Sequence, residues 1–198
     1  MLAIACGTIA KQPLPGARSY VERALQLDPE NSDAYTTSSL VYLLHGRHDE
    51  AVADARRAIE LAAGSADAAA FASFVFASSG YPDEAKNQIE KAMALSPNYP
   101  PYYLGHLGNA YRLLGRTEEA IASLKAYDAR SPGFGLTDLV IAYQENGQPD
   151  EAKQTAKRLL TIRPSFTIAS WLKTQFRRDT DRLEADLAAL RAASLPMS

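Results

Sequence analysis

Residues Leu107–Ile121 read LGNAYRLLGRTEEAI, and this stretch decides the fold. The small residue Gly108 precedes the aromatic Tyr111 by three positions, and Tyr111 precedes Gly115 by four. Spacings of three and four place side chains on one face of an α-helix, and glycine is common just beyond a helix end. Ala120 follows in the next apolar-periodic segment. The pattern predicts two helices joined by a tight turn at Gly115, with small and aromatic residues where they meet.

The same pattern returns about every 34 residues along the chain. The turn glycines are Gly46, Gly80, Gly115 and Gly147. An aromatic residue stands four positions before each of them, at Tyr42, Phe76, Tyr111 and Tyr143. An alanine stands five positions after each, at Ala51, Ala85, Ala120 and Ala152. Prolines at Pro97, Pro132 and Pro164 follow three of the four glycines at a constant distance, where they end the second helix of each pair.

Self-similarity at this period, with two helices per unit, resembles the tetratricopeptide repeat over nearly the whole chain. The resemblance implies an all-α fold, an α-solenoid coiled into a right-handed superhelix. It implies about four full helix pairs, an N-terminal half repeat and C-terminal capping helices. The expected division of the single array is a partial repeat at 1–31, full repeats at 32–65, 66–100, 101–132 and 133–164, and capping helices at 165–198.

The residue types predict where the helices begin and end. Asp or Glu follows each turn glycine by three or four positions, where a negative charge favours the start of a helix. Pro82 and Pro149 suit a first helical turn. The predicted helices are Gly16–Leu27, Ser32–His45, Asp49–Leu61, Ala66–Ser79, Pro82–Leu95, Pro101–Leu114, Thr117–Arg130, Gly135–Asn146, Pro149–Ile162, Phe166–Phe176 and Thr180–Ala193.

The two ends depart from the repeat. The last helix places Leu183, Leu187 and Leu190 on one face and Arg182, Asp186 and Arg191 on the polar remainder, as an amphipathic cap would. Trp171 is expected between this cap and the last repeat, and partner docking is the alternative for the helix. At the N-terminus, residues 1–12 match the back part of a first helix, with Ala5 at its small position. The chain is therefore expected to start inside a repeat.

Composition bounds the function. The chain has 198 residues, 46% of them hydrophobic, and a formal net charge of -2. This balance argues against nucleic-acid binding, which usually needs a basic face. No apolar run approaches the roughly 18 residues of a membrane helix. The segment MLAIACGTIAK lacks the basic start of a signal peptide, and Cys6 is the only cysteine, so a cytoplasmic location is expected.

No residue pattern points to catalysis. His45 and His48 are three positions apart, but they flank a turn glycine and no cysteine or carboxylate cluster accompanies them at zinc spacing. His106 stands alone in its helix. The stretch GNAYRLLGR lacks the lysine and the preceding strand of a phosphate-binding loop. We therefore expect no enzyme activity, no catalytic residue, no cofactor and no metal site.

Tetratricopeptide arrays bind partners on a concave face lined by the first helix of each pair. The resemblance carries the groove positions to Thr36, Leu40, Leu43, Phe74, Ala77, Tyr102, Asn109, Arg112, Thr137, Ile141 and Gln144. A bound segment would place apolar anchors near Leu40 and Phe74 and a polar group near Asn109 and Arg112. Alternatively, Leu40, Phe74 and Ile141 simply pack between neighbouring helices. The lysine and asparagine clamp of the chaperone-binding members is absent, because Thr36 and Leu40 stand at its first two positions.

A narrower resemblance covers the second half of the chain. SPNYPPYYLGHLGNAYRLLGRTEEAI and RPSFTIASWLKTQFRRDTDRLEADLAALRAASLP are similar to the C-terminal repeat region of bacterial class III adenylate/guanylate cyclase fusion proteins. Similar tails also follow bacterial winged-helix regulators. No cyclase domain is present in these residues, so no catalytic residue carries over.

Three interpretations of function remain open. The favoured one is a non-catalytic scaffold that binds a protein or peptide, as a monomer or weak homodimer. The second is the regulatory region of a cyclase-like signalling protein, separated from its catalytic domain. The third is a small-molecule sensor in the groove.

Overall fold

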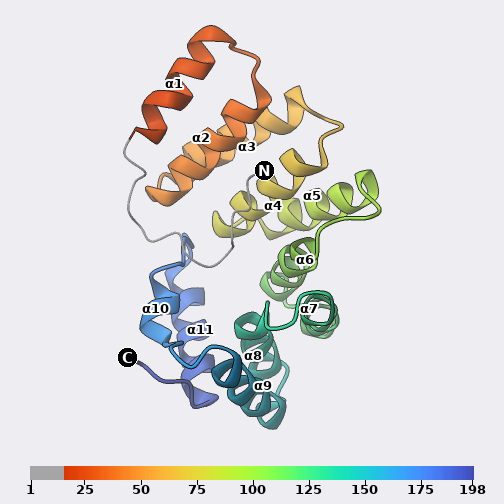
Figure 1. Ribbon diagram of the computed structural model, residues 1–198, viewed down its shortest axis with the longest axis vertical. Helices are drawn as coiled ribbons and strands as arrows, with labels where there is room; N and C mark the ends of the chain where they lie inside the picture. Colours follow the sequence, from red (N-terminus) through yellow and green to blue (C-terminus); the bar gives the residue numbers. More distant parts are fainter. Residues whose placement is uncertain (1–15) are drawn as a thin grey trace.

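The computed structural model describes residues 16–198, which form eleven helices and no strand. The helices follow one another in an arc that begins at α1, passes through α4 and α5, and reaches α8 and α9 (Figure 1). The last two helices turn back on the inner side of the arc. The bounds are α1 Ala17–Leu27, α2 Ser32–Leu44, α3 His48–Leu61, α4 Ala66–Ser78, α5 Pro82–Leu95, α6 Tyr102–Leu113, α7 Thr117–Arg130, α8 Leu136–Glu145, α9 Pro149–Ile162, α10 Ile168–Leu172 and α11 Thr180–Ala192.

The helices pack as consecutive pairs. α2 packs on α3, α4 on α5, α6 on α7 and α8 on α9, and each pair contacts the next one. The first helices of neighbouring pairs, α2 with α4 and α4 with α6, also touch. The expected all-α solenoid is confirmed, with the first helix of each pair on the inner side of the arc (Figure 1).

The turns inside the pairs have the predicted geometry. The glycines of all four turns have positive φ, between 68° and 90°, where a side chain would be strained. In each turn the residue after the glycine donates its backbone N–H to the carbonyl of the aromatic residue four positions before the glycine, at 2.9 Å. This bond satisfies a carbonyl that the helix end would leave unpaired. The repeated glycine and aromatic residue thus form one structural unit.

The small residues lie where two helices of a pair approach. The four repeated alanines have 0% exposure, and Ser39 and Ser73 opposite them have 1%. A Cβ added at Gly108 would stand 2.7 Å from Cγ of Leu124, so any larger residue there would force Leu124 to shift. The packing role inferred from these positions is confirmed.

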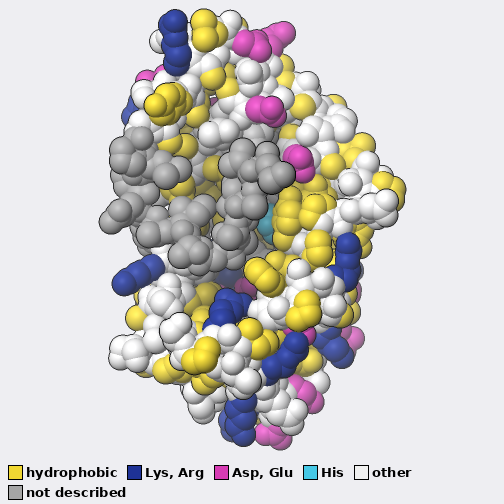
Figure 2. Space-filling view, in the orientation of Figure 1, with side chains coloured by type: hydrophobic (Ala, Val, Ile, Leu, Met, Phe, Trp, Pro, Cys, Tyr) yellow, Lys and Arg dark blue, Asp and Glu magenta, His cyan; other side chains and the backbone are white. Residues whose placement is uncertain are grey.

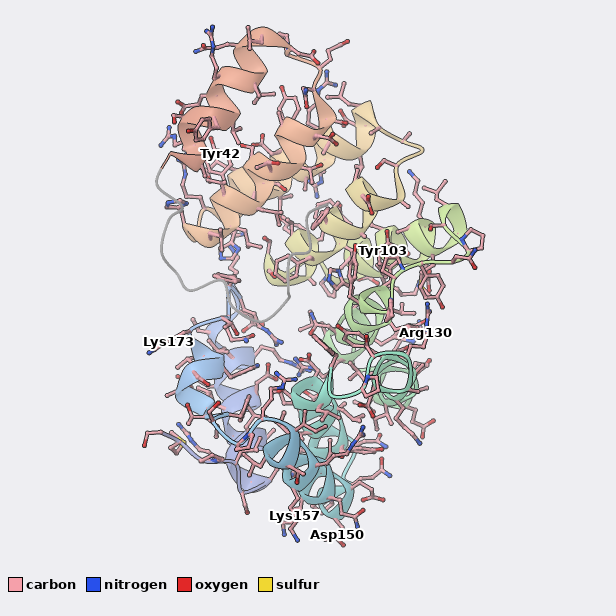
Figure 3. All side chains as sticks on the ribbon, in the orientation of Figure 1. Tyr42, Tyr103, Arg130, Asp150, Lys157 and Lys173 are labelled. Carbon is pink, nitrogen blue, oxygen red and sulfur yellow. The ribbon has the colours of Figure 1, made fainter. Side chains whose placement is uncertain are left out.

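Some surface contacts repeat as well. The guanidinium of Arg47 lies 4.5 Å from the ring centre of Tyr42, and that of Arg116 lies 4.6 Å from the ring centre of Tyr111. At the end of α7, Arg130 donates to the carbonyl of Tyr99 at 2.7 Å. Tyr42 and Arg130 are labelled in Figure 3, where Asp150 and Lys157 project from α9 at the far end of the array.

The prediction of one helix over Phe166–Phe176 is wrong. The observed helix, α10, spans only Ile168–Leu172, and a turn closes it where the N–H of Thr174 bonds the carbonyl of Trp171 at 2.9 Å. The residues after this turn instead contact distant helices, because Arg177 bonds Asn109 of α6 and Arg178 bonds Asp49 of α3. The expectations for residues 1–12, including Ala5 and Cys6, lie outside the described residues.

Candidate functional site

The predicted groove residues lie on the first helices of the pairs, but the structure divides them into two groups. Partly exposed are Thr36, Leu40, Phe74, Tyr102, Asn109 and Gln144. Buried are Leu43, Ala77, Arg112, Thr137 and Ile141. The partly exposed apolar residues come from α2, α4 and α6, whereas Thr137 and Ile141 belong to α8, on which α11 packs. Among residues 16–198, the partly exposed part of the inner face therefore lies toward α2, α4 and the start of α6.

Three side-chain rings lie together in this partly exposed part of the inner face. The ring of His106 lies between Phe74 and Tyr102, with ring centres 5.7 Å and 5.5 Å away. Leu40 and Phe74 pack on the buried cluster around Leu43 and Phe76. Figure 2 shows hydrophobic side chains gathered over α4 to α6 on this face. The inner face thus offers a partly exposed apolar and aromatic surface.

His106 is a member of this surface that sequence reasoning set aside as an isolated histidine. Its Nδ1 is buried without a hydrogen-bond partner, and burial lowers the pKa of the ring to about 4. At neutral pH the ring is therefore uncharged and suits the apolar surface. Its position three residues before the predicted groove residue Asn109 was the available signal, because that spacing shares a helix face.

The polar end of the predicted groove is filled by the chain itself. Arg112 of α6 and Asp186 of α11 are both fully buried and form a two-pronged ion pair, with N–O distances of 2.6 Å and 3.1 Å. Arg112 also donates to Glu145 at 2.8 Å. The prediction that Asp186 lies on the polar outer face of the last helix is wrong, because Asp186 is buried and paired with Arg112.

Two further arginines complete this network. Arg177 Nη1 lies 2.5 Å from Asp186, and Arg182 donates to Glu145 at 2.6 Å. Arg182 also donates to the main-chain carbonyl of Arg112 at 3.0 Å. Removing one partner of such a buried ion pair strongly destabilises the folded protein, because the other charge is left buried and unpaired. The network therefore fixes α11 to α6 and α8.

Burial and the close packing of these charges shift the pKa values of several groups in the network. Burial lowers the pKa of Arg177, and the positive charge of Arg112 adds to the effect. For Arg112, burial is outweighed by the charge and hydrogen bonds of Asp186, so its pKa rises. Burial raises the pKa of the neighbouring Asp138. As placed here, Arg112 presents no surface to a partner; its role in binding stays a prediction.

The other residues considered for chemistry are separated. His45 Nδ1 faces the carbonyl of Val41 at 2.7 Å, whereas His48 Nδ1 faces the hydroxyl of Ser79 at 3.1 Å. Across residues 16–198 no group of three histidine, cysteine or carboxylate side chains is arranged to hold a metal ion. In the same part of the chain, none of the helices has the length and apolar character needed to cross a membrane.

Comparison with known families agrees with this architecture. Two models, each described as tetratricopeptide repeat, match residues 14–73 and residues 101–133 and 136–166. The chain belongs to the tetratricopeptide repeat family. No match was found among curated protein sequences. The further resemblance to cyclase fusion proteins is not shown by these matches and stays a prediction.

Several solved structures resemble most of the array. PilW, a widely conserved type IV pilus biogenesis factor, is 22% identical with a TM-score of 0.73, over 91% of this chain and 81% of PilW. A thermophilic repeat protein of Thermus thermophilus is 21% identical with a TM-score of 0.64, over 87% of this chain and 88% of that one. YrrB, described as having an unusual peptide-binding site, is 19% identical with a TM-score of 0.62, over 78% and 88%. At such identities the likeness concerns the fold.

Proposed function

We propose that this protein is a non-catalytic interaction scaffold that binds a segment of a partner protein on the inner face between α2, α4 and α6. The observation that carries the proposal is the partly exposed surface of Phe74 and Tyr102 around the uncharged ring of His106, with Leu40 packed on the same apolar cluster as Phe74. Aromatic side chains held rigidly in a repeat array supply apolar contact at little entropic cost. YrrB, which has a similar fold, is described as having a peptide-binding site.

The surface accounts for the kind of ligand. Successive first helices present one or two apolar side chains each, so an extended or helical segment can place its own apolar residues along them. The partly exposed Thr36 can bond to the backbone of that segment, whereas the amide oxygen of Asn109 already accepts from Arg177 of this chain. The small-molecule interpretation lacks comparable support, because the polar side chain on which it was based, Arg112, is buried against Asp186.

The first prediction concerns Phe74. Peptides are selected from a random display library on the immobilised full chain, and their affinity is then measured by calorimetry. Replacing Phe74 by alanine should weaken binding at least tenfold, or about 1.4 kcal/mol, because it removes a central aromatic anchor. The matched control is Ile162→Ala, an apolar side chain 45% exposed at the end of α9.

The outcomes separate the inner face from other surfaces. Binding that weakens with Phe74→Ala but stays within twofold in Ile162→Ala supports the proposal. Affinity unchanged by Phe74→Ala places the selected ligands elsewhere. Arg112→Glu does not serve as a second variant, because it would bury a carboxylate against Asp186 and disturb the fold itself.

The regulatory interpretation has one supporting observation. The closing segment that resembles the cyclase fusion proteins, from Arg163 to Pro196, contains the whole of α10 and α11 and is packed into the array. A probe against α11 that detects the native polypeptide in its producing cell tests this interpretation. A band near 21.5 kDa favours the stand-alone scaffold. A much larger band favours a regulatory region, and cyclase activity would then be assayed on the longer protein.

A further inference from the structure

Residues 173–179, here called the strap, join α10 to α11 and lie against the inner side of the array. The strap touches helices that are far away in the sequence: α3, the end of α4, and α6. Three consecutive residues make these contacts, Phe176, Arg177 and Arg178. A segment of this chain thus already lies beside the predicted groove positions Leu43, Ala77 and Asn109.

Phe176 fills an apolar position. Its ring packs on the buried cluster that contains Leu43, Val75, Phe76 and Ala77. The ring is only partly buried. The cluster therefore accepts an aromatic side chain at its surface without needing it to complete the core.

Arg177 meets the polar end of the same face. Its guanidinium lies 3.4 Å from the amide oxygen of Asn109 and 2.5 Å from the carboxylate of Asp186. The side chain is 9% exposed. Two acceptor groups at this point can be matched only by a group with several donors, and a guanidinium has five.

Arg178 makes the outermost contacts. Its backbone N–H donates to the carbonyl of Ser78, the last residue of α4, at 2.9 Å. Its guanidinium donates to Asp49 in the first turn of α3 at 2.6 Å. Both side chains of this ion pair are well exposed, at 44% and 75%, so the contact contributes little to stability.

We propose that this surface recognises, in a partner protein, a segment with an aromatic residue and an arginine two positions later, and that Phe176 and Arg178 of the strap are its intramolecular competitors. The inference rests on the proposed scaffold function and names the chemistry of the partner. The apolar cluster fits the aromatic residue and the Asp49 carboxylate fits the arginine, while Arg177 of this chain stays paired with Asp186.

The two ends of the strap explain why the strap can exchange. α10 is held by Ile168, which is 1% exposed, and α11 by the buried residues Asp186 and Leu190. Between them Arg177 is held in the buried network, whereas the Phe176 side chain is held by a half-buried ring contact and the Arg178 side chain by an exposed ion pair, so these two side chains can exchange. A segment attached at both ends competes at a high effective concentration, which weakens the apparent affinity of an external ligand. Weakening the strap should therefore increase affinity for such a ligand.

The test uses the full chain and a fluorescein-labelled peptide of the strap sequence, KTQFRRDT, followed by fluorescence anisotropy. The strap-release variant carries Phe176→Ser and Arg178→Ser, and Arg177 is retained because it belongs to the buried network. We expect the variant to bind the peptide at least tenfold more tightly than the natural chain. A control peptide with serine at the aromatic and both arginine positions should not bind.

Two further variants identify where the peptide binds and replace the double variant if it does not fold. Asp49→Asn added to the release variant should weaken peptide binding several-fold, because Asp49 would again pair with an arginine. The proposal is overturned if the natural and release chains bind the peptide with equal affinity. It is also overturned if the release variant is folded but does not bind the peptide. If circular dichroism shows that the double variant is unfolded, Arg178→Ser alone decides, and an affinity that does not rise overturns the proposal.

The result is separable from the scaffold proposal. Library-selected ligands that depend on Phe74 but do not compete with the strap peptide would retain the scaffold and overturn this inference. Trp171 is the only tryptophan of the chain and its carbonyl bonds both Thr174 and Gln175 of the strap. Its emission should therefore change when a true competitor displaces the strap, and unchanged emission at saturating peptide would count against displacement.

Discussion

At the scale of single residues, His106 is a titratable side chain on the inner face whose pKa lies well below its ordinary value. Its ring lies between two aromatic rings and burial lowers its pKa to about 4, from an ordinary value of 6.5. Between these values the unfolded chain binds the proton and the folded chain does not. The free energy of unfolding is therefore not reduced by this histidine above about pH 6.5, and it decreases as the pH falls from 6.5 toward 4.

This difference gives a measurable pH effect. Between pH 7 and pH 5 the free energy of unfolding of the natural chain should fall by about 2 kcal/mol more than that of His106→Phe. Phenylalanine keeps an aromatic ring beside Phe74 and Tyr102 but cannot titrate. Urea unfolding at the two pH values measures both chains. Parallel loss in the two chains would show that His106 is exposed enough to bind a proton when folded.

At the scale of helix pairs, the closest approach decides which residue fits. In the α6–α7 pair a Cβ on Gly108 would lie 2.7 Å from Cγ and 2.9 Å from Cδ2 of Leu124, a side chain with 0% exposure. Overpacking of this kind costs about 1–3 kcal/mol, against a gain of about 1 kcal/mol from replacing glycine in a helix. Gly108→Ala should therefore lower stability by about 1 kcal/mol net.

A second glycine supplies the comparison. Gly64 has no atom within 4 Å of an added Cβ and no positive φ. Gly64→Ala should be neutral or slightly stabilising, because alanine restricts the unfolded chain. Thermal unfolding of the two variants measures the contrast. A Gly108→Ala chain as stable as Gly64→Ala would mean that α6 and α7 separate without cost.

At the scale of the whole molecule, the C-terminal segment of the array contacts helices near its beginning and middle. In an open solenoid each repeat contacts only its neighbours. Here Asp186 pairs with Arg112, 74 positions earlier, and Arg178 pairs with Asp49, 129 positions earlier. Long-range contacts of this kind make the C-terminal segment part of the fold rather than an appendage. Its removal should therefore affect the array beyond the last repeat.

The prediction at this scale concerns Asp186. Asp186→Asn leaves Arg112 and Arg177 buried without their common counter-charge, and breaking such a pair costs about 3–5 kcal/mol. Glu184→Gln, on the exposed side of the same helix, should change stability by less than about 0.5 kcal/mol. Urea unfolding compares them. If Asp186→Asn costs no more than the control, α11 is held by its apolar residues alone.

Much of the fold was predictable because its signals are local. The bounds of α5, α7 and α9 agree with the sequence prediction, since a turn glycine, an acidic first turn and a terminal proline or extended residue mark each of them. The buried alanines and the positive φ of the turn glycines also follow from residue type. The positions of the candidate site residues on the first helices, such as Phe74 on α4 and Asn109 on α6, follow from the family resemblance; that these residues bind a partner stays a prediction.

The remainder depended on partners that are distant in the sequence. An aspartate on the polar side of an amphipathic helix gives no sign that Arg112 lies opposite, and no local signal shows that the residues after α10 contact α3, α4 and α6. The sequence by itself determined the helices of the repeats, their turns and their pairing, because these depend on interactions within about 34 residues. Only the tertiary structure decided where α10 ends and which part of the inner face stays partly exposed among residues 16–198, because the curvature of the array brings its C-terminal segment back onto earlier helices.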